Sequence, residues 1–481
     1  MSDHVKSCAP FLFMRVPCFA LLCTSIIAGV VSGSETQAAT YYVNNQTGSD
    51  EYDGLSEKTA VATIARAIAL SKTSDRIELA NTGTVYRESM LFRKLGGTPD
   101  RPFLIEGNGA VISGLESLPA EQWKSTGEGV YVLQLDKTPY GNPFLVSAGK
   151  RLPAARNREA LKEGEHYWDR ESHRIYLHCA AGKRPVDYKL EATLQVSGLT
   201  LTSASYISCQ NLIAEHFTND GFNIHGDCRG IRLENVVARH NGDDGISIHE
   251  AGGLIVQNAY VHGNFYGIQD VNASRSVYNG VLAEKNQVGV SLVGGYHSLV
   301  DCQVRNNTQK EIDIAGAVPR HLIGGEQNLL ARTILFAQNV SVFGEGSAVG
   351  LSVRNGAHAI VEHTVITGTK TGVSIDAQSH GHLTLTAVSK CDTILDLRSK
   401  DCFLDYNLYG VGRFRWMETD YSADQWAEYQ AASQQDQHSR IEQISVAADG
   451  MVSAPGEALL FSERKQTVGP TAPFTLSLSQ D

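Results

Sequence analysis

The middle of the chain repeats short apolar strands at nearly constant intervals. Four Val- and Ile-rich segments between residues 219 and 292 each contain a glycine, at Gly221, Gly245, Gly267 and Gly289. The spacings between these glycines are 24, 22 and 22 residues. A period of this length, with one short strand per repeat, predicts a solenoid of stacked coils. Similar segments at 312–314, 350–353 and 372–376 predict further coils, and the leucine framework of leucine-rich repeats is missing.

An asparagine precedes each of these glycines, at positions 219, 241, 264 and 286. Because asparagines at equivalent turns of stacked strands bond to one another, we expect an amide ladder along the solenoid. Gly245 lies two residues farther from its asparagine than Gly221 does. We therefore expect Gly242–Asp243 to be an insertion that bulges one turn. Irregularities of this kind often mark functional sites.

The sequence on either side of the repeats predicts caps and an insertion. An amphipathic helix is expected over 63–70 and another helix over 423–432, where each would cover one end of the stack and its unpaired strand edges. The repeat lapses between 115 and 189, and the alternating, aromatic-rich sequence there predicts a small β insertion. The expected parts are a signal peptide (1–38), an N-terminal cap with the first coils (39–114), the insertion (115–190), the β-helix repeats (191–402), and a C-terminal cap and tail (403–481).

The first 40 residues have the pattern of a secretory signal. Lys6 and Arg15 precede an apolar run from Val16 to Val31, and small residues follow up to Ala38. The apolar run is too short and too interrupted for a membrane span. We therefore expect a secreted, periplasmic or cell-surface protein with no membrane insertion after the signal is removed. The cysteines beyond the signal include no Cys-x-x-Cys pair, and we expect them to be buried single thiols.

The net charge of −11 limits the expected partners. Nucleic acids and anionic membranes require a basic face, so neither is an expected partner. An extracellular polysaccharide is compatible with this charge, although an acidic polysaccharide would need a local basic patch. We expect the protein to act as a monomer.

The start of the folded chain resembles a known family. It contains Tyr-Tyr-Val (41–43), Gly-Ser-Asp (48–50) and Asp-Gly-Leu-Ser (53–56). The segment 40–88 resembles the N-terminal segment of bacterial pectin-lyase-like β-helix proteins, and the segments 405–409 and 421–429 resemble a recurrent ending in that superfamily. The resemblance implies an all-β fold, a right-handed parallel β-helix solenoid, here with an N-terminal capping helix and a small β insertion. It implies no single activity, because the superfamily includes lyases and glycosidases.

Alternation along the repeat strands separates core positions from outward positions. With Phe222, Ile246 and Ile268 pointing inward, the outward column comprises Asn223, His225, Ser247, His249, Gln269, Ser291 and Asp313. Residues in register on neighbouring coils lie about 4.8 Å apart, so His225 and His249 are expected to stack. The candidate catalytic residues on this face are Asp220, Asp243, Asp244, His225 and His249. The candidate substrate contacts are Asn223, Glu250, Gln269 and Asp270.

The aspartates suggest glycoside hydrolysis. Carboxylates this close do not both ionise easily, so one has a raised pKa and can protonate a leaving oxygen while another acts as base or nucleophile. Asn219-Asp-Gly221 and Gly242-Asp-Asp244 resemble two motifs of polygalacturonase-type β-helix hydrolases, Asn-Thr-Asp and Gly-Asp-Asp. This resemblance implies catalytic roles for Asp220, Asp243 and Asp244. On the next coil, Asn264-Phe-Tyr-Gly267 stands where that family has Gly-His-Gly, and no Arg-Ile-Lys follows.

Other interpretations of this face stay open. A polysaccharide lyase would use His225 or His249 as base, with Ca²⁺ on the aspartates or a basic side chain to neutralise the uronate. The basic side chains considered are Arg229, Arg239 and Lys285. A non-catalytic carbohydrate-binding or structural β-helix would have a flat, uncharged face. Asn-Asp-Gly and Asp-Gly-Ile are also ordinary turn-to-strand sequences, because Asn and Gly accept left-handed geometry. The sequence does not identify a metal. The one cofactor that it suggests is Ca²⁺, which only a lyase would use.

Overall fold

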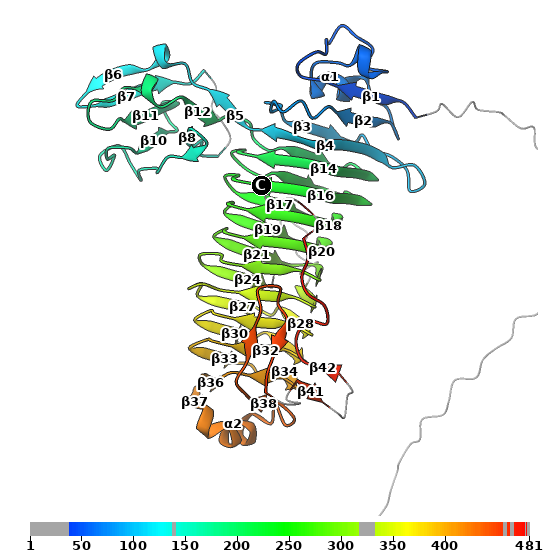
Figure 1. Cartoon of the computed structure of the whole chain (residues 1–481), viewed down its shortest axis with the longest axis vertical. Helices are drawn as coiled ribbons and strands as arrows, with labels where there is room; N and C mark the ends of the chain where they lie inside the picture. Colours follow the sequence, from blue (N-terminus) through cyan, green and yellow to red (C-terminus); the bar gives the residue numbers. More distant parts are fainter. Residues whose placement is uncertain are drawn as a thin grey trace, which may run out of the picture. The chain divides into compact units, whose positions relative to one another are not determined.

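The computed structural model describes residues 38–136, 141–316, 332–455, 459–461, 466–476 and 478. The expected signal peptide, apart from Ala38, lies outside these residues. Parallel strands stack along one axis in the described chain (Figure 1). The predicted right-handed parallel β-helix is confirmed. None of the described helices is long and apolar enough to cross a membrane.

Two sheets form the walls of the solenoid. The first, which we call the site sheet, has twelve strands, and all of its pairs are parallel except the last. Its strands are β3 (Met90–Arg93), β13 (Leu199–Thr202), β15 (Phe222–His225), β17 (Asp244–Ile248), β19 (Tyr266–Val271), β21 (Val288–Val293), β24 (Lys310–Ala315), β27 (Val349–Arg354), β30 (Thr371–Ile375), β33 (Thr393–Leu397), β36 (Arg413–Trp416) and β37 (Thr419–Tyr421).

The second, which we call the long sheet, has 18 parallel strands. Several of its strands contain a left-handed residue, such as Asn235, that bends the strand without ending it. The strands are β1 (Thr40–Val43), β2 (Arg76–Leu79), β4 (Phe103–Ser113), β14 (Ile207–Glu215), β16 (Ile231–Arg239), β18 (Gly253–His262), β20 (Arg275–Glu284), β22 (Tyr296–Val300), β23 (Gln303–Arg305), β25 (Ile334–Gln338), β26 (Ser341–Phe343), β28 (His358–Glu362), β29 (Val365–Thr367), β31 (His380–Thr384), β32 (Ala387–Ser389), β34 (Cys402–Asp405), β35 (Leu408–Tyr409) and β38 (Arg440–Ile441).

The core consists of apolar columns that run along the stack. Phe222 lies in register with Ile246, which lies in register with Ile268, and all three are buried. The repeated glycines are needed for close approach rather than for a left-handed turn. A Cβ at Gly245 would lie 2.5 Å from the carbonyl oxygen of Gly267, and one at Gly267 would lie 2.6 Å from that of Gly289. Any side chain at these positions would therefore push neighbouring coils apart.

An asparagine ladder runs beside these glycines, but with a different membership from the expected one. The side chains of Asn241, Asn264 and Asn286 each donate to the next asparagine at 3.1–3.2 Å, and the last bond reaches Asn307. Each side-chain oxygen also accepts a backbone N–H of the preceding coil. The ladder ends at buried Glu311, whose carboxylate accepts from the Asn307 side chain at 2.6 Å.

The expected place of Asn219 in this ladder is wrong. The place before Asn241 in the ladder is taken by the backbone N–H of Phe217, which donates to the side-chain oxygen of Asn241. Asn219 lies beside Asp243 instead, because the Asp243 N–H donates to the Asn219 carbonyl at 3.0 Å. Gly242–Asp243 is therefore no insertion. The coils that contain Asp220 and Asp244 have turns of equal length before their glycines. In the coils after them, this turn is one residue shorter.

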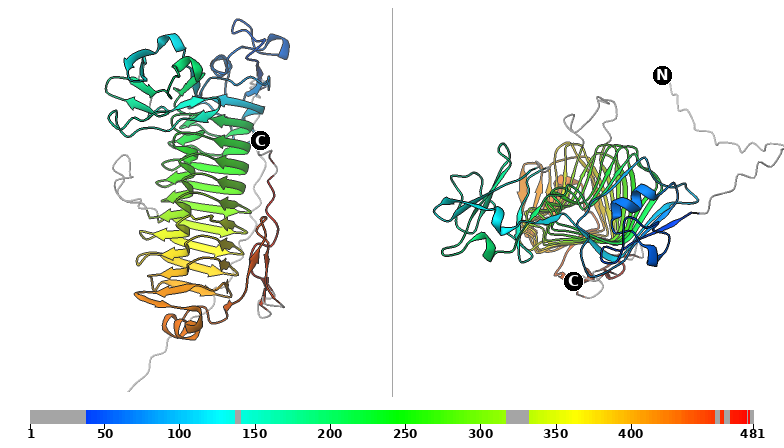
Figure 2. Two further views of the ribbon diagram at one scale, coloured as in Figure 1. Left: turned by 60° about the vertical axis from the view of Figure 1, so that its left-hand side comes forward. Right: turned by 90° about the horizontal axis from the view of Figure 1, so that it is seen from above.

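The predicted helices cap the two ends. Helix α1 (Ile64–Leu70) buries Ile64 and Ala67 against the first coils, after a 3₁₀ turn η1 (Glu57–Thr59). Helix α2 (Trp426–Ser433) follows η5 (Ala423–Gln425) and packs Tyr429 against the last coil. The tail then runs back along the solenoid, where Phe474, Leu476 and Leu478 contact the long sheet (Figure 2). Its short hairpins are β39 (Ser445–Val446) with β40 (Val452–Ser453) and β41 (Leu460–Phe461) with β42 (Gln466–Thr467).

The predicted small β insertion has two antiparallel four-stranded sheets. Trp123 and Trp168 are buried in its own core, and the described cysteines of the whole chain are free thiols. One sheet contains β6 (Lys124–Gly127), β7 (Val130–Gln134), β10 (His166–Asp169) and β11 (Arg174–His178); the other contains β5 (Leu115–Ser117), β8 (Leu145–Ser147), β9 (Lys150–Arg151) and β12 (Leu190–Thr193). The 3₁₀ turns η2 (Ala120–Gln122) and η3 (Pro185–Asp187) complete it.

The end of the asparagine ladder predicts a pH-dependent stability. Burial raises the pKa of Glu311 from 4.5 to about 7. A carboxyl group whose pKa is raised by folding stabilises the fold below its unfolded pKa, and this contribution is lost as the pH rises to the folded value. Glu311→Gln keeps an acceptor for Asn307 without the charge. Between about pH 5 and pH 8, we expect the free energy of unfolding of the variant to rise by up to about 3 kcal/mol relative to that of the wild type, as measured by denaturant unfolding.

The exposed Glu345→Gln is the matched control, and it should change stability much less than Glu311→Gln does. An identical pH dependence in wild type and Glu311→Gln would contradict the assignment.

Candidate active site

The candidate site lies where two neighbouring coils enter the site sheet. Asp220 immediately precedes Gly221 and β15, and Asp244 begins β17. The Gly221 N–H donates to the Asp244 carbonyl at 3.0 Å, and the Asp244 N–H donates to the Asp220 carboxylate at 3.2 Å. One donor atom each from Asp220, Asp244 and His249 lie within 4.8 Å of one another. The structure therefore brings together three of the residues that the sequence singled out.

The two aspartates form a buried carboxylate pair, each only 2% exposed. The Asn219 side chain donates to Asp220 at 2.8 Å, whereas Oδ1 of Asp244 has no hydrogen-bond partner among the described residues. Burial raises the pKa of both carboxyl groups well above the usual range, and the negative charges of the neighbouring aspartates raise them further. The pair therefore retains a proton at pH values where ordinary aspartates have lost theirs.

Asp243 is the partly exposed aspartate of the cluster. It lies beside Asn219 on the coil before it, and burial raises its pKa above 3.8. On the following coil Tyr266 pairs in register with Asp244. Burial raises the pKa of Tyr266, and the charges of Asp244 and Asp243 contribute to that rise. Sequence analysis missed Tyr266. The available signal was that Tyr266 stands at a position where the two preceding coils have aspartate.

The two histidines follow at the carboxyl ends of the same strands, and a ring nitrogen of His249 reaches back to within 4.8 Å of the aspartate oxygens. The rings of His225 and His249 stack with centroids 4.1 Å apart and planes 14° from parallel. His249 Nε2 lies 2.7 Å from the hydroxyl of Ser247. Burial lowers the pKa of His249 to about 4, with a contribution from His225, so His249 is neutral at physiological pH. Nδ1 of His225 lies 3.5 Å from Glu250, which also accepts the Gly226 N–H.

The expected substrate contacts lie in different places. Asn223 is buried, and its side chain donates weakly to Ser197 at 3.4 Å. Gln269 is in register with Ser247 on the outer side of the site sheet and is partly exposed. Glu250 is partly exposed beside the histidines.

Asp270 is buried inside the coil, so its expected role as a substrate contact on the outer face is wrong. Asp270 is 0% exposed and accepts from the Tyr278 hydroxyl at 2.7 Å, with His297 at 3.2 Å. It lies on the same side of β19 as Ile268, inside the coil, because alternate residues of a strand point to opposite faces. Hydrogen bonds within the core satisfy it, so it is not available to a substrate on the outer face.

Among the described residues, two groups have enough ligand atoms close together for a metal ion. These are Asp220, Asp244 and His249, and His225, His249 and Glu250. Ca²⁺ binds six to eight oxygen atoms, and each group includes at least one imidazole nitrogen. The donor sets therefore do not fit the Ca²⁺ that a lyase could use.

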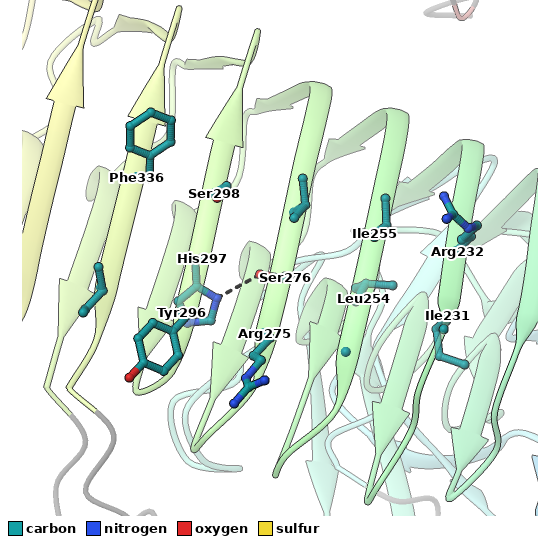
Figure 3. Close-up of a pocket in the computed structure, with 14 residues that line it drawn as sticks. Ile231, Arg232, Leu254, Ile255, Arg275, Ser276, Tyr296, His297, Ser298 and Phe336 are labelled. Atoms are coloured by element: carbon teal, nitrogen blue, oxygen red, sulfur yellow. Dashed lines mark hydrogen bonds between the residues drawn. The ribbon is translucent and has the colours of Figure 1, made fainter. Parts of the chain in front are cut away.

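A hollow of about 540 Å³ lies on the long sheet (Figure 3). It crosses β16, β18, β20, β22 and β25, with apolar side chains such as Ile255 and Phe336 on its wall. Tyr296 is 52% exposed there, and Arg275 lies 5.9 Å from the centre of its ring. The described residues that line this hollow include no carboxylate. It therefore lacks the acid that glycosidic cleavage requires, and the aspartate cluster stays the candidate active site.

Comparison with solved structures supports the fold. A complex of XylC with xylose matches over 91% of this chain and 94% of its own length, with a TM-score of 0.58 and 12% identity. Pectate lyase Pel9A matches over 77% and 80%, with a TM-score of 0.49 and 13% identity. The likeness to XylC shows that the two chains share this fold. A glycoside hydrolase matches over 78% and 94%, with a TM-score of 0.42 and 12% identity. No family model and no curated protein matches the sequence.

Coupling between the two buried carboxyl groups can be tested directly. Asp220→Asn removes one negative charge beside Asp244 and leaves an acceptor for the Asp244 N–H. We expect the pKa of Asp244 to fall, because a like charge that disfavoured its ionised form is gone. In infrared difference spectra, the band of protonated carboxyl groups should then titrate at lower pH than in the wild type. Asp227→Asn, an exposed aspartate paired with Arg229, is the control and should leave this band unchanged. An unaltered midpoint in Asp220→Asn would show that the two groups titrate independently.

Proposed function

We propose that the protein cleaves the glycosidic bonds of an extracellular polysaccharide on the outer side of the site sheet, at Asp220, Asp243, Asp244 and His249. The observation that supports this most is the buried carboxylate pair beside a neutral histidine. The similar folds of carbohydrate-active proteins agree with the proposal at the level of architecture alone. Stability does not explain the pair, since two adjacent buried carboxyl groups raise the free energy of the fold.

Hydrolysis is the reaction that the aspartates support. The leaving oxygen of a glycosidic bond needs a proton, and a carboxyl group with a raised pKa still holds one near neutral pH. The Asp220–Asp244 pair can supply that proton. Asp243, partly exposed on the same turn, is the carboxylate that can act as base or nucleophile on the opposite side of the bond. Tyr266 and Ser247 lie beside these groups and can orient them.

β-Elimination is the second candidate, and the neutral His249 favours it. An eliminating enzyme needs a base that is unprotonated at working pH, and His249 meets this requirement above about pH 4. A lyase also needs positive charge near the uronate carboxylate. The reaction products distinguish the two candidates, because elimination alone leaves an unsaturated uronate that absorbs ultraviolet light.

The proposal predicts activity on a polysaccharide panel and its loss in three variants. Mature protein should release reducing ends from at least one of pectins, alginates, xylans and sulfated glycans. Asp220→Asn, Asp243→Asn and Asp244→Asn should each lower kcat/KM by about a thousandfold, since general acid–base groups contribute roughly that much. Asp227→Asn is the matched control and should retain full activity. Absence of cleavage across the whole panel would favour a non-catalytic binding or structural β-helix instead.

The pH profile tests His249 separately. If its neutral form is required, kcat/KM should fall below about pH 4, where His249 becomes protonated. His225→Gln should move this acidic limb to higher pH, because the charge of His225 is one cause of the lowered pKa. His249→Gln should abolish the limb along with most of the activity. A limb that stays in place in His225→Gln would assign it to another group.

A further inference from the structure

Positively charged side chains gather beside the aspartates although the chain as a whole is acidic. A hollow of about 450 Å³ is lined by Asn142, Arg151 and Arg170 of the insertion and by Asn219, Gly242 and Asp243 of the solenoid, among others. A second hollow of about 260 Å³ shares Arg151 and Gly242 with it and is also lined by Lys285. The two hollows therefore adjoin, and three cations face the turn that holds Asp243.

The two arginines have no carboxylate partner among the described residues. The guanidinium of Arg151, at the end of β9, lies 3.8 Å from the centre of the Phe144 ring, which fixes it without neutralising it. Arg170 follows β10, and it is exposed. Lys285 has one partner, Glu284, at 3.3 Å, and its side chain is 67% exposed. In a protein with net charge −11, acidic groups could have neutralised the two arginines, and no described carboxylate pairs with either of them.

The sheet of the insertion that carries Arg151 is packed internally and is bonded to the solenoid through Arg87. At that sheet, Leu115, Phe144 and Val146 form a small buried cluster, and the Phe144 N–H donates to Thr193 at 3.0 Å. Arg87 of the solenoid pairs with Glu191 at 2.6 Å. Arg151 is thus presented from a packed sheet rather than from a free loop. A guanidinium held in this way is preorganised for a planar or tetrahedral anion.

We propose that Arg151, Arg170 and Lys285 form a subsite for an acidic sugar residue of the polysaccharide, one with a carboxylate or a sulfate ester. This inference rests on the proposed function for its substrate, since it places the anionic ring beside the cleaved bond. The cations bind the anion by charge-assisted hydrogen bonds. Neutral sugar chains would leave these cations without an anionic partner and bind more weakly. The insertion thereby determines the substrate class, while the solenoid supplies the acid and the base.

Binding to a cleavage-deficient protein tests the subsite apart from catalysis. In an Asp244→Asn background, isothermal titration calorimetry would compare oligogalacturonate, a sulfated chondroitin oligosaccharide and neutral xylohexaose. We expect one of the two anionic probes to bind at least about tenfold more tightly than xylohexaose. Arg151→Gln and Arg170→Gln should each weaken that probe by about tenfold or more, since each removes a charged hydrogen-bond donor. Oligogalacturonate or the sulfated probe as the tighter ligand would identify the anion.

Arg158→Gln is the matched control. Its guanidinium also lies over an aromatic ring of the insertion, 4.6 Å from the centre of Tyr176, but it does not line the hollow. It should leave binding unchanged, and Arg151→Lys should retain part of the affinity because it keeps the charge. Equal binding of the neutral and anionic probes, or unchanged binding in both arginine variants, would overturn the inference. Tight arginine-dependent binding without cleavage by the wild-type protein would overturn the proposed function and leave the subsite standing.

Discussion

The parallel register of the coils, with equivalent residues about 4.8 Å apart, is the constraint on which the rest of the structure depends. Each side chain at a given position faces the same position on the coil before and after it. An apolar column packs in this arrangement without needing hydrogen bonds. The side chains of a polar column must bond to one another, and asparagine can do so because its amide both donates and accepts, as Asn241 to Asn307 show. The ladder ends where a group that only accepts, Glu311, replaces the amide.

The same constraint explains the chemistry of the candidate site. Aspartates at equivalent positions cannot both be ionised next to each other in a buried place, so Asp220 and Asp244 are driven to keep a proton. Histidines at equivalent positions stack, and burial together with the charge of His225 lowers the pKa of His249, which keeps this residue neutral. A parallel stack thus produces an acid and a neutral base from ordinary side chains. Burial and the neighbours that the repeat supplies together alter these pKa values.

Sequence periodicity predicted the solenoid, the inward apolar columns and the stacking of His225 on His249, because each depends on local alternation and on a constant period. It failed where neighbouring coils differ in turn length. Asn219 was aligned with Asn241, although the longer turn of both coils places it beside Asp243. Asp270 was expected among the substrate contacts, although alternation places it with Ile268 inside the coil. Its buried partners are Tyr278, on the next strand of the same coil, and His297, on a neighbouring coil, and the alternation within one strand predicts neither contact.

The periodicity of the sequence could not predict which side chains of the insertion lie beside the aspartates. Arg151 and Arg170 precede the aspartate coils by about 50 to 90 residues, and their place beside Asp243 depends on how an antiparallel unit packs on a parallel stack. A solenoid alone offers only near-neighbour contacts, so its outer face repeats with the coil period. An element outside the repeat removes that symmetry at one end of the site. The cations can therefore select a ligand without being repeated along the stack, and the costly aspartate pair is needed on only two coils.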